Sequence, residues 1–189
     1  KYKPIEILNI SKQAFECCNK DYIFKITNES HLIIEIVRQK SLNLGYLLGK
    51  MKFLDINSME IFKLFDGLKY FKIEFSEKVD DGDLAFIEEI VNNSFDMTKI
   101  IKLEKPKILK SELFFDLNHD KQIALLKLET KNQKGLLAFI AKVFDEFGVD
   151  IVDAKIHTQK NIARDLFLIE KNESLCEKLD DIIDRLCVE

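Results

Sequence analysis

The chain has 189 residues, of which 47% are hydrophobic and 33% charged, a composition typical of a globular protein. Its net charge of −4 argues against nucleic-acid and anionic-membrane binding, because both require a concentrated basic surface. No apolar run approaches the roughly 18 residues that span a bilayer. Because the opening residues also lack the apolar core of a secretion signal, we expect a cytoplasmic protein. The first residue is not methionine, so we expect a piece of a longer protein.

The first part of the chain predicts four strands, with one helix after the second strand and another after the fourth. A lead-in at 1–20 contains a short helical candidate, Ser11–Asn19. The strands are expected at Tyr22–Thr27, His31–Val37, Asn57–Phe65 and Tyr70–Phe75, the last two joined by an Asp66-Gly67 hairpin turn. The inward helical positions are Leu44, Leu47, Leu48 and Met51, then Leu84, Ile87, Ile90 and Val91.

The second part repeats this order. An early strand is expected at Glu112–Leu117 and a second at Ile123–Glu129. The next two strands alternate between inward and outward positions, with inward residues at Val152, Ala154 and Ile156, then at Ala163, Asp165, Phe167 and Ile169. The first helix carries an apolar stripe from Leu136 to Phe147 and ends at Gly148, and the last begins at Ser174 with a capping box.

These elements predict an α+β fold with two units in the order ββαββα. Each unit would be an antiparallel four-stranded sheet with two helices on one face. The expected divisions are a lead-in at 1–20, a first unit at 21–96, an exposed linker at 97–110 and a second unit at 111–189.

The sequence predicts no catalytic, metal or cofactor site. It contains no phosphate-binding loop, no G-x-S-x-G and no suggestive Cys/His pair. Its three histidines are scattered, and its four cysteines lack zinc-site spacing, so reduced thiols are expected. The acidic run Asp80–Asp83 lacks the remaining ligands of a calcium loop and is interpreted as a helix start.

Four segments of the second unit resemble the ACT domain, a small module that senses amino acids. They are the loop Asn132–Leu137, the corner Phe147–Ile151, the strand Ala154–Thr158 and the strand Arg164–Phe167. With its weaker upstream copy, this unit resembles the paired ACT domains at the end of bacterial PII uridylyltransferase/uridylyl-removing enzymes. The resemblance covers roughly residues 110–188 well and 22–95 poorly. It implies two ferredoxin-like ACT domains.

The resemblance also implies where an amino acid, with glutamine as the leading candidate, would bind. Gly135 would let the backbone approach the ligand, and the first N–H groups of the following helix would hold its carboxylate. Asn132 and Lys134 stand where the family has Asp and Pro. The candidate ligand-binding residues are Asn132, Gly135, Leu136, Leu137, Ile151 and Asp153, with a second candidate site at Gln39, Asn43, Leu44, Ile56 and Ser58.

Function therefore stays open between two main hypotheses. In the first, the chain is the glutamine-sensing region of a nitrogen-regulatory nucleotidyltransferase, acting on upstream catalytic domains and, through the parent enzyme, on the PII signal protein. In the second, a ligand-free ACT pair docks domains or forms a homodimer. Asp165 is expected to make a structural hydrogen bond. An RNA-recognition module is disfavoured, because no strand shows the required aromatic and basic alternation.

Overall fold

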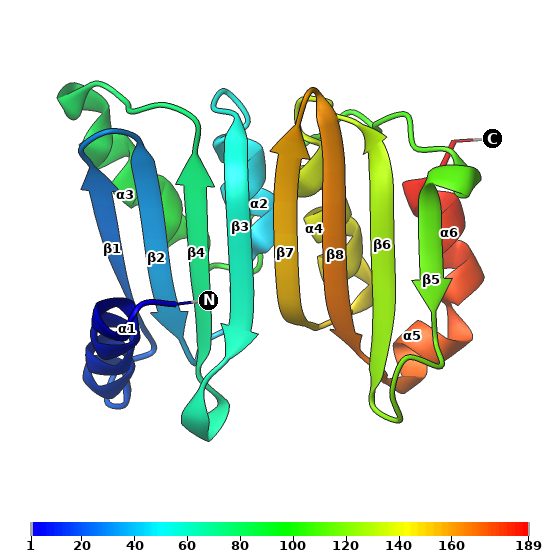
Figure 1. Ribbon diagram of the computed structural model, residues 1–189, viewed down its shortest axis with the longest axis horizontal. Coiled ribbons are helices and arrows are strands. Elements are labelled where there is room, and N and C mark those ends of the chain that lie inside the picture. The colour runs from blue at the N-terminus through cyan, green and yellow to red at the C-terminus, as the bar shows by residue number, and fades with distance from the viewer. Residues whose placement is uncertain (1, 189) are drawn as a thin grey trace.

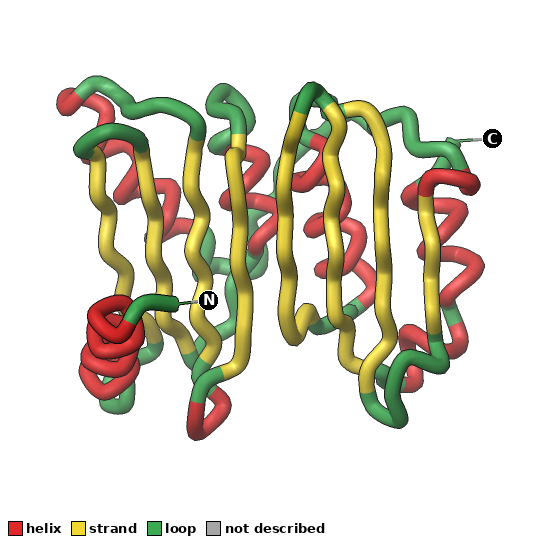
Figure 2. Tube along the Cα trace, in the orientation of Figure 1, coloured by secondary structure: helices red, strands yellow, loops and turns green. Residues whose placement is uncertain are grey.

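The computed structural model describes residues 2–188, without the side chain of Ser174. These residues form an antiparallel eight-stranded sheet and six α-helices (Figures 1 and 2). The strands are β1 (Tyr22–Asn28), β2 (Leu32–Arg38), β3 (Ile56–Lys63), β4 (Lys69–Phe75), β5 (Leu113–Asp116), β6 (Ile123–Lys131), β7 (Ile151–Gln159) and β8 (Ile162–Glu170). The helices are α1 (Pro4–Cys17), α2 (Leu44–Lys50), α3 (Leu84–Asn93), α4 (Leu136–Phe147), α5 (Glu173–Glu177) and α6 (Leu179–Leu186).

The strands lie in the order β1-β2-β4-β3-β7-β8-β6-β5. From either edge to the centre the chain therefore takes the same path, β1-β2-β4-β3 in the first half and β5-β6-β8-β7 in the second. The predicted early strand is part of the sheet, as β5 pairs with β6 from Leu113 to Asp116. Every predicted strand is present, with ends that differ by a few residues.

The prediction of two separate four-stranded sheets is corrected by the pairing of β3 with β7. Ser58–Ile61 lie opposite Ala154–His157 and join the halves into one continuous sheet (Figure 1). The unpaired N–H and C=O groups of two edge strands satisfy one another in this arrangement. Residues of both halves belong to one large buried hydrophobic cluster.

Helices α2, α3, α4 and α6 cover one face of the sheet, and α1 lies on the other (Figure 1). Helix α2 packs directly against α4 behind the junction of β3 and β7. A Cβ atom at Gly45 would stand 2.7 Å from the Cα atom of Lys142, so glycine permits this close approach. On the other face, Ile10 and Ala14 of α1 pack on Tyr70 of β4.

Three local predictions need correction. The lead-in helix extends from Pro4 to Cys17 rather than over Ser11–Asn19. The predicted last helix is divided into α5 and α6, and the Asn172 side chain accepts the N–H of Leu175 at 2.8 Å. Ser174 thus lies within α5 rather than before it, and its predicted capping contact lies outside the described side chains.

The expected linker at 97–110 is only partly exposed. Pro106 and Ile108 are buried, and Ile108 accepts a backbone hydrogen bond of 2.8 Å from Val188. Ile101 packs against α2, where a Cβ atom at Gly49 would stand 2.7 Å from its Cδ1 atom. The connection therefore belongs to the helical layer along part of its length, because its apolar side chains find buried contacts there.

Candidate ligand-binding site

A cavity of about 50 Å³ lies where the two halves meet. The first half contributes the end of α2 and the start of β3, and the second contributes the loop before α4 and parts of β7 and β8. The lining includes Leu48, Lys52, Asp55, Ile56, Asn132, Lys134, Gly135, Leu136, Leu137, Ile156, Thr158, Ala163 and Asp165. A buried water occupies about 10–15 Å³ on this measure, so the cavity has room for only a few waters.

Five of the sequence-predicted residues border this cavity. Asn132, Gly135, Leu136 and Leu137 come from the first candidate set, and Ile56 comes from the second. The structure thus brings the loop before α4 to the start of β3 in the other half of the chain. Ile151 lies at the start of β7, outside this lining.

The loop before α4 is shaped by Gly135, whose φ angle is 78°. A side chain at this position would meet open space, so the left-handed backbone is the reason for glycine. The N–H of Leu136 donates to the carbonyl of Gln133 at 3.0 Å and is not free for a ligand. Leu137 follows in the first turn, where N–H groups lack helical acceptors and the positive end of the helix dipole lies.

This loop is fastened by two adjacent residues near its start, Asn132 and Gln133. The Gln133 side chain accepts the N–H of Lys107 and donates to the carbonyl of Lys107, both at 2.9 Å. The N–H of Asn132 donates to the carbonyl of Asn161 in the β7–β8 turn at 2.9 Å. The cavity wall is therefore held to the 97–110 connection and to the neighbouring hairpin.

Asp165 forms a buried polar wall of the cavity. Its side chain is 3% exposed, and its Oδ1 atom has no hydrogen-bond partner among the described residues. Burial raises the pKa of this carboxyl to about 7, and a hydrogen bond from the backbone of His157 opposes the shift. A buried group that lacks a partner is costly unless a ligand or water satisfies it.

Thr130 lies beside Ala163 in the β6–β8 register and is also 3% exposed. Its Oγ1 atom likewise lacks a partner among the described residues. Asp55 and Ala163 line the cavity and were not predicted as site residues. Asp165 makes a structural hydrogen bond, as predicted, with the backbone of His157, and it also lines the cavity.

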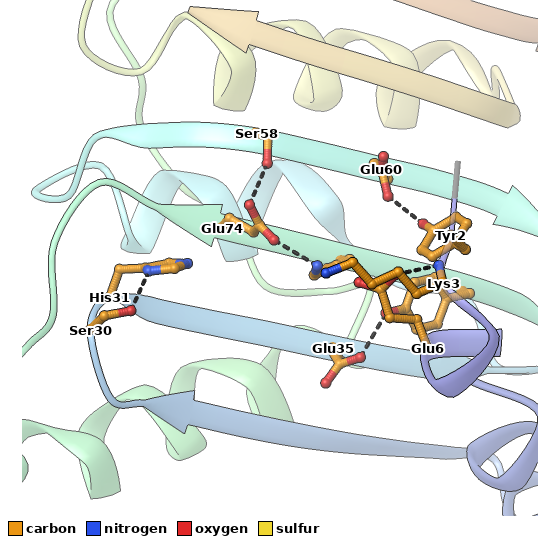
Figure 3. Close-up of polar contacts among 11 residues, drawn as sticks. Tyr2, Lys3, Glu6, Ser30, His31, Glu35, Ser58, Glu60 and Glu74 are labelled. Atoms are coloured by element: carbon orange, nitrogen blue, oxygen red, sulfur yellow. Dashed lines mark hydrogen bonds and ion pairs between the residues drawn. The ribbon is translucent and has the colours of Figure 1, made fainter. Parts of the chain in front are cut away.

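Asp153 and Ser58 lie away from this cavity. Asp153 borders a groove of about 480 Å³ between α1 and the open face of the sheet. Ser58 donates to Glu74 (Figure 3), at a distance of 2.9 Å. Glu74 also pairs with Lys72 at 2.6 Å. In the same view, Tyr2 of the N-terminal segment donates to Glu60 of β3. These contacts satisfy the polar groups on the face opposite α2 and α4.

The other members of the second candidate set are not brought together. Gln39 is exposed and donates to the carbonyl of Cys18 at 3.5 Å. The Asn43 side chain caps α2 by accepting the N–H of Tyr46 at 2.9 Å. Leu44 is buried in the core at 4% exposure. The structure therefore forms a site at one end of the β3–β7 junction from residues of both predicted sets.

Within residues 2–188, apart from the Ser174 side chain, no cluster of His, Cys, Asp and Glu has the arrangement of a metal site. All four cysteines are free. None of the described helices combines the length and apolar character needed to cross a bilayer. The features that remain are those of a small pocket, with the buried Asp165 inside and the exposed Asp55, Lys52 and Lys134 at its rim.

No protein-family model matches the chain. The chain is 32% identical over 109 residues to bifunctional uridylyltransferase/uridylyl-removing enzymes of Pseudomonas savastanoi and Pseudomonas syringae, and 30% identical over 115 residues to that of Pseudomonas fluorescens. These matches cover 51–54% of the chain but only 12–13% of each enzyme. A solved structure of an unknown protein from Galdieria sulphuraria shares 13% identity at a TM-score of 0.33, covering 83% of this chain and 91% of that one, too weak a likeness to assign a fold. The sequence matches support a relation between about half of this chain and the uridylyltransferase/uridylyl-removing enzymes.

Proposed function

We propose that this chain is an amino-acid-sensing regulatory region of a nitrogen-regulatory enzyme similar to the uridylyltransferase/uridylyl-removing enzymes. Each half of the sheet would be one ferredoxin-like ACT unit, and glutamine is the leading candidate ligand. The observation that carries the proposal is the cavity between the halves, where Asp165 is buried without a partner for one oxygen. The similarity to the Pseudomonas enzymes supports the enzyme class.

The chemistry of the cavity suits a zwitterion. The first turn of α4 and the rim lysines Lys52 and Lys134 supply positive potential for a carboxylate. Asp165 supplies a partner for an ammonium group. A sensor that works near millimolar ligand needs only about −4 kcal/mol, which a few such contacts provide.

Binding would change the arrangement of the two halves. The present cavity admits only a few waters, so an amino acid requires the exposed rim lysines and the α2–β3 corner to move outward. A ligand that favours the opened state shifts the population toward it. Gln133 would pass this change to the 97–110 connection through its contacts with Lys107. Upstream catalytic domains, and through them the PII signal protein, would respond to the shifted arrangement.

Calorimetric titration of the 189-residue chain with glutamine tests the proposal, with glutamate as the comparison ligand. We expect saturable heat at millimolar glutamine and a rise in melting temperature. Asp165→Asn should weaken binding at least about tenfold, since a charge-assisted hydrogen bond contributes about 1.5–3 kcal/mol. The matched control is Asp153→Asn on the opposite face, which should leave the affinity unchanged.

The second candidate is a docking or dimerisation module without a ligand, which the small volume of the cavity favours. The two functions give opposite results in the same titration. Absence of heat and of a thermal shift at 10 mM glutamine would remove the sensing proposal. Chain association that persists in the same experiment, measured by sedimentation, would then support docking.

A further inference from the structure

The two halves of the sheet correspond strand by strand. In the β3–β4 hairpin Lys63 lies opposite Lys69, and in the β7–β8 hairpin Thr158 lies opposite Ala163. Lys69 and Ala163 therefore occupy the same place in their halves. Lysine fills that place in the first half, whereas alanine leaves the cavity open in the second.

The start of the third strand corresponds as well. The carbonyl of Asp55 accepts the N–H of Ser76, and the carbonyl of Asp150 accepts the N–H of Glu170, each at 2.9 Å. In both halves the isoleucine after this aspartate begins the third strand and is followed by an irregular register. Asp55 is thus the counterpart of Asp150.

In the first half, the Lys69 side chain is only 6% exposed. Its ammonium group donates to the carboxylate of Asp150 and, at 2.9 Å, to the carbonyl of Ile151. A carboxylate and a carbonyl acceptor offset the cost of burying this ammonium group. Asp150 and Ile151 belong to the second half. Their counterparts in the first half are Asp55 and the carbonyl of Ile56, and both residues line the cavity beside Ala163.

The residues next to Lys69 and Ala163 also differ between the halves, again by a cation that is present only in the first half. In the first half, the guanidinium of Arg38 lies 5.4 Å from the ring centre of Phe71. The sheet register places Thr130 and Asp165 at the equivalent positions of the second half. A cation on an aromatic ring is thus replaced by a small hydroxyl group and a carboxyl. The first half thus carries two cations at these positions, Lys69 and Arg38, and the equivalent positions of the second half, Ala163 and Thr130, carry none.

We infer that the Lys69 side chain permanently fills one of two equivalent ammonium-binding positions. The chain therefore has one open ligand-binding site rather than two. The cavity takes the primary ammonium group of its ligand at the counterpart of the filled position. There the group would contact Asp55, the carbonyl of Ile56 and Asp165. The inference rests on the proposed function for the existence of a natural ligand. The positive charge of the ligand group is inferred from the ammonium group that Lys69 places at the equivalent position.

Chemical rescue tests the occupied place. Lys69→Ala removes the ammonium group, leaves Asp150 without its partner and should lower the melting temperature of the chain. Methylammonium chloride at about 0.2 M should restore at least about 2 °C to this variant and have little effect on the wild-type chain. Tetramethylammonium chloride at equal concentration is the control, because it carries the charge without an N–H donor.

Introducing a lysine at Ala163, the equivalent of Lys69, tests the open ammonium-binding position in the cavity. Ala163→Lys should raise the melting temperature above that of Ala163→Met, which adds a flexible side chain without an ammonium group. Both variants should abolish glutamine binding, since both occupy the cavity. If Ala163→Lys fails to fold, the rescue of Lys69→Ala decides alone.

Two results would overturn the inference. The first is equal rescue of Lys69→Ala by methylammonium and tetramethylammonium. The second is a folded Ala163→Lys no more stable than Ala163→Met. Failure of the proposed function is a distinct outcome. The wild-type chain would then not bind glutamine, while methylammonium would still rescue Lys69→Ala and Ala163→Lys would still be more stable than Ala163→Met.

Discussion

Asp165→Asn should change how the stability of the chain depends on pH. The wild-type carboxyl is buried, and its pKa is raised from 3.8 to about 7 because burial disfavours the charged form. The folded chain therefore holds this proton more tightly than the unfolded chain. The carboxyl contributes its full stability below about pH 4 and loses it as the pH rises through about 7. The difference between the two pKa values corresponds to at most about 4 kcal/mol.

Urea unfolding followed by far-ultraviolet circular dichroism suits this test, as the chain has no tryptophan. We expect the free energy of unfolding of the wild-type chain to fall by about 2–4 kcal/mol between pH 4 and 8. Asp165→Asn should lack most of this decrease and be more stable than the wild-type chain at pH 8, because the amide stays neutral.

Asp145 provides the control for this experiment. Burial raises the pKa of its carboxyl to about 6, while the N–H of Gly45, donated at 3.1 Å, opposes the shift. Asp165→Asn should therefore retain a shallow slope between about pH 4 and 6, and Asp145→Asn should remove that part alone. Parallel pH profiles for Asp165→Asn and the wild-type chain would contradict a neutral Asp165 in the folded state.

Two further predictions concern packing and unpaired polar atoms. Gly45→Ala should destabilise the chain by about 1–3 kcal/mol, because its Cβ atom would meet the Lys142 backbone, whereas Gly82→Ala, with open space around it, should have little effect in the same urea titration. Thr130→Val should be as stable as the wild-type chain or more stable in thermal unfolding, since its buried hydroxyl lacks a partner among the described residues. A loss above about 1 kcal/mol would reveal a hydrogen bond from this hydroxyl.

The order of the elements was predictable from local patterns. Gly148 ends α4 with a φ angle of 64°, as its position after an apolar stripe predicted. Asp66 and Gly67 both adopt positive φ angles in the β3–β4 turn, as the hairpin signal requires. The inward positions of β8 are buried from Ala163 to Ile169, because strand alternation places every second residue on the helical face.

The candidate site was only partly predictable. The loop with Asn132 and Gly135 was found because glycine before an apolar helix is a local signal. Ser58 was grouped with Ile56 by proximity in sequence, yet the two belong to opposite faces of the sheet around an irregular register. Local pattern does not show where such an irregularity falls, so the face of each residue near it stays undetermined.

Sequence patterns thus predict the eight strands, the inward faces of their regular parts and the repeated path of the chain, because period and turn chemistry act over a few residues. The pairing of β3 with β7 is different. It joins two edge strands through backbone N–H and C=O groups, which do not depend on the side chains, so no residue pattern predicts it. That pairing brings Asp55 and Asp165 to the lining of one cavity at one end of the junction and pairs Lys69 with Asp150 at the other. The site at Asp150 is filled because Lys69 is long enough to reach it. The equivalent site at Asp55 is open because the corresponding residue is Ala163.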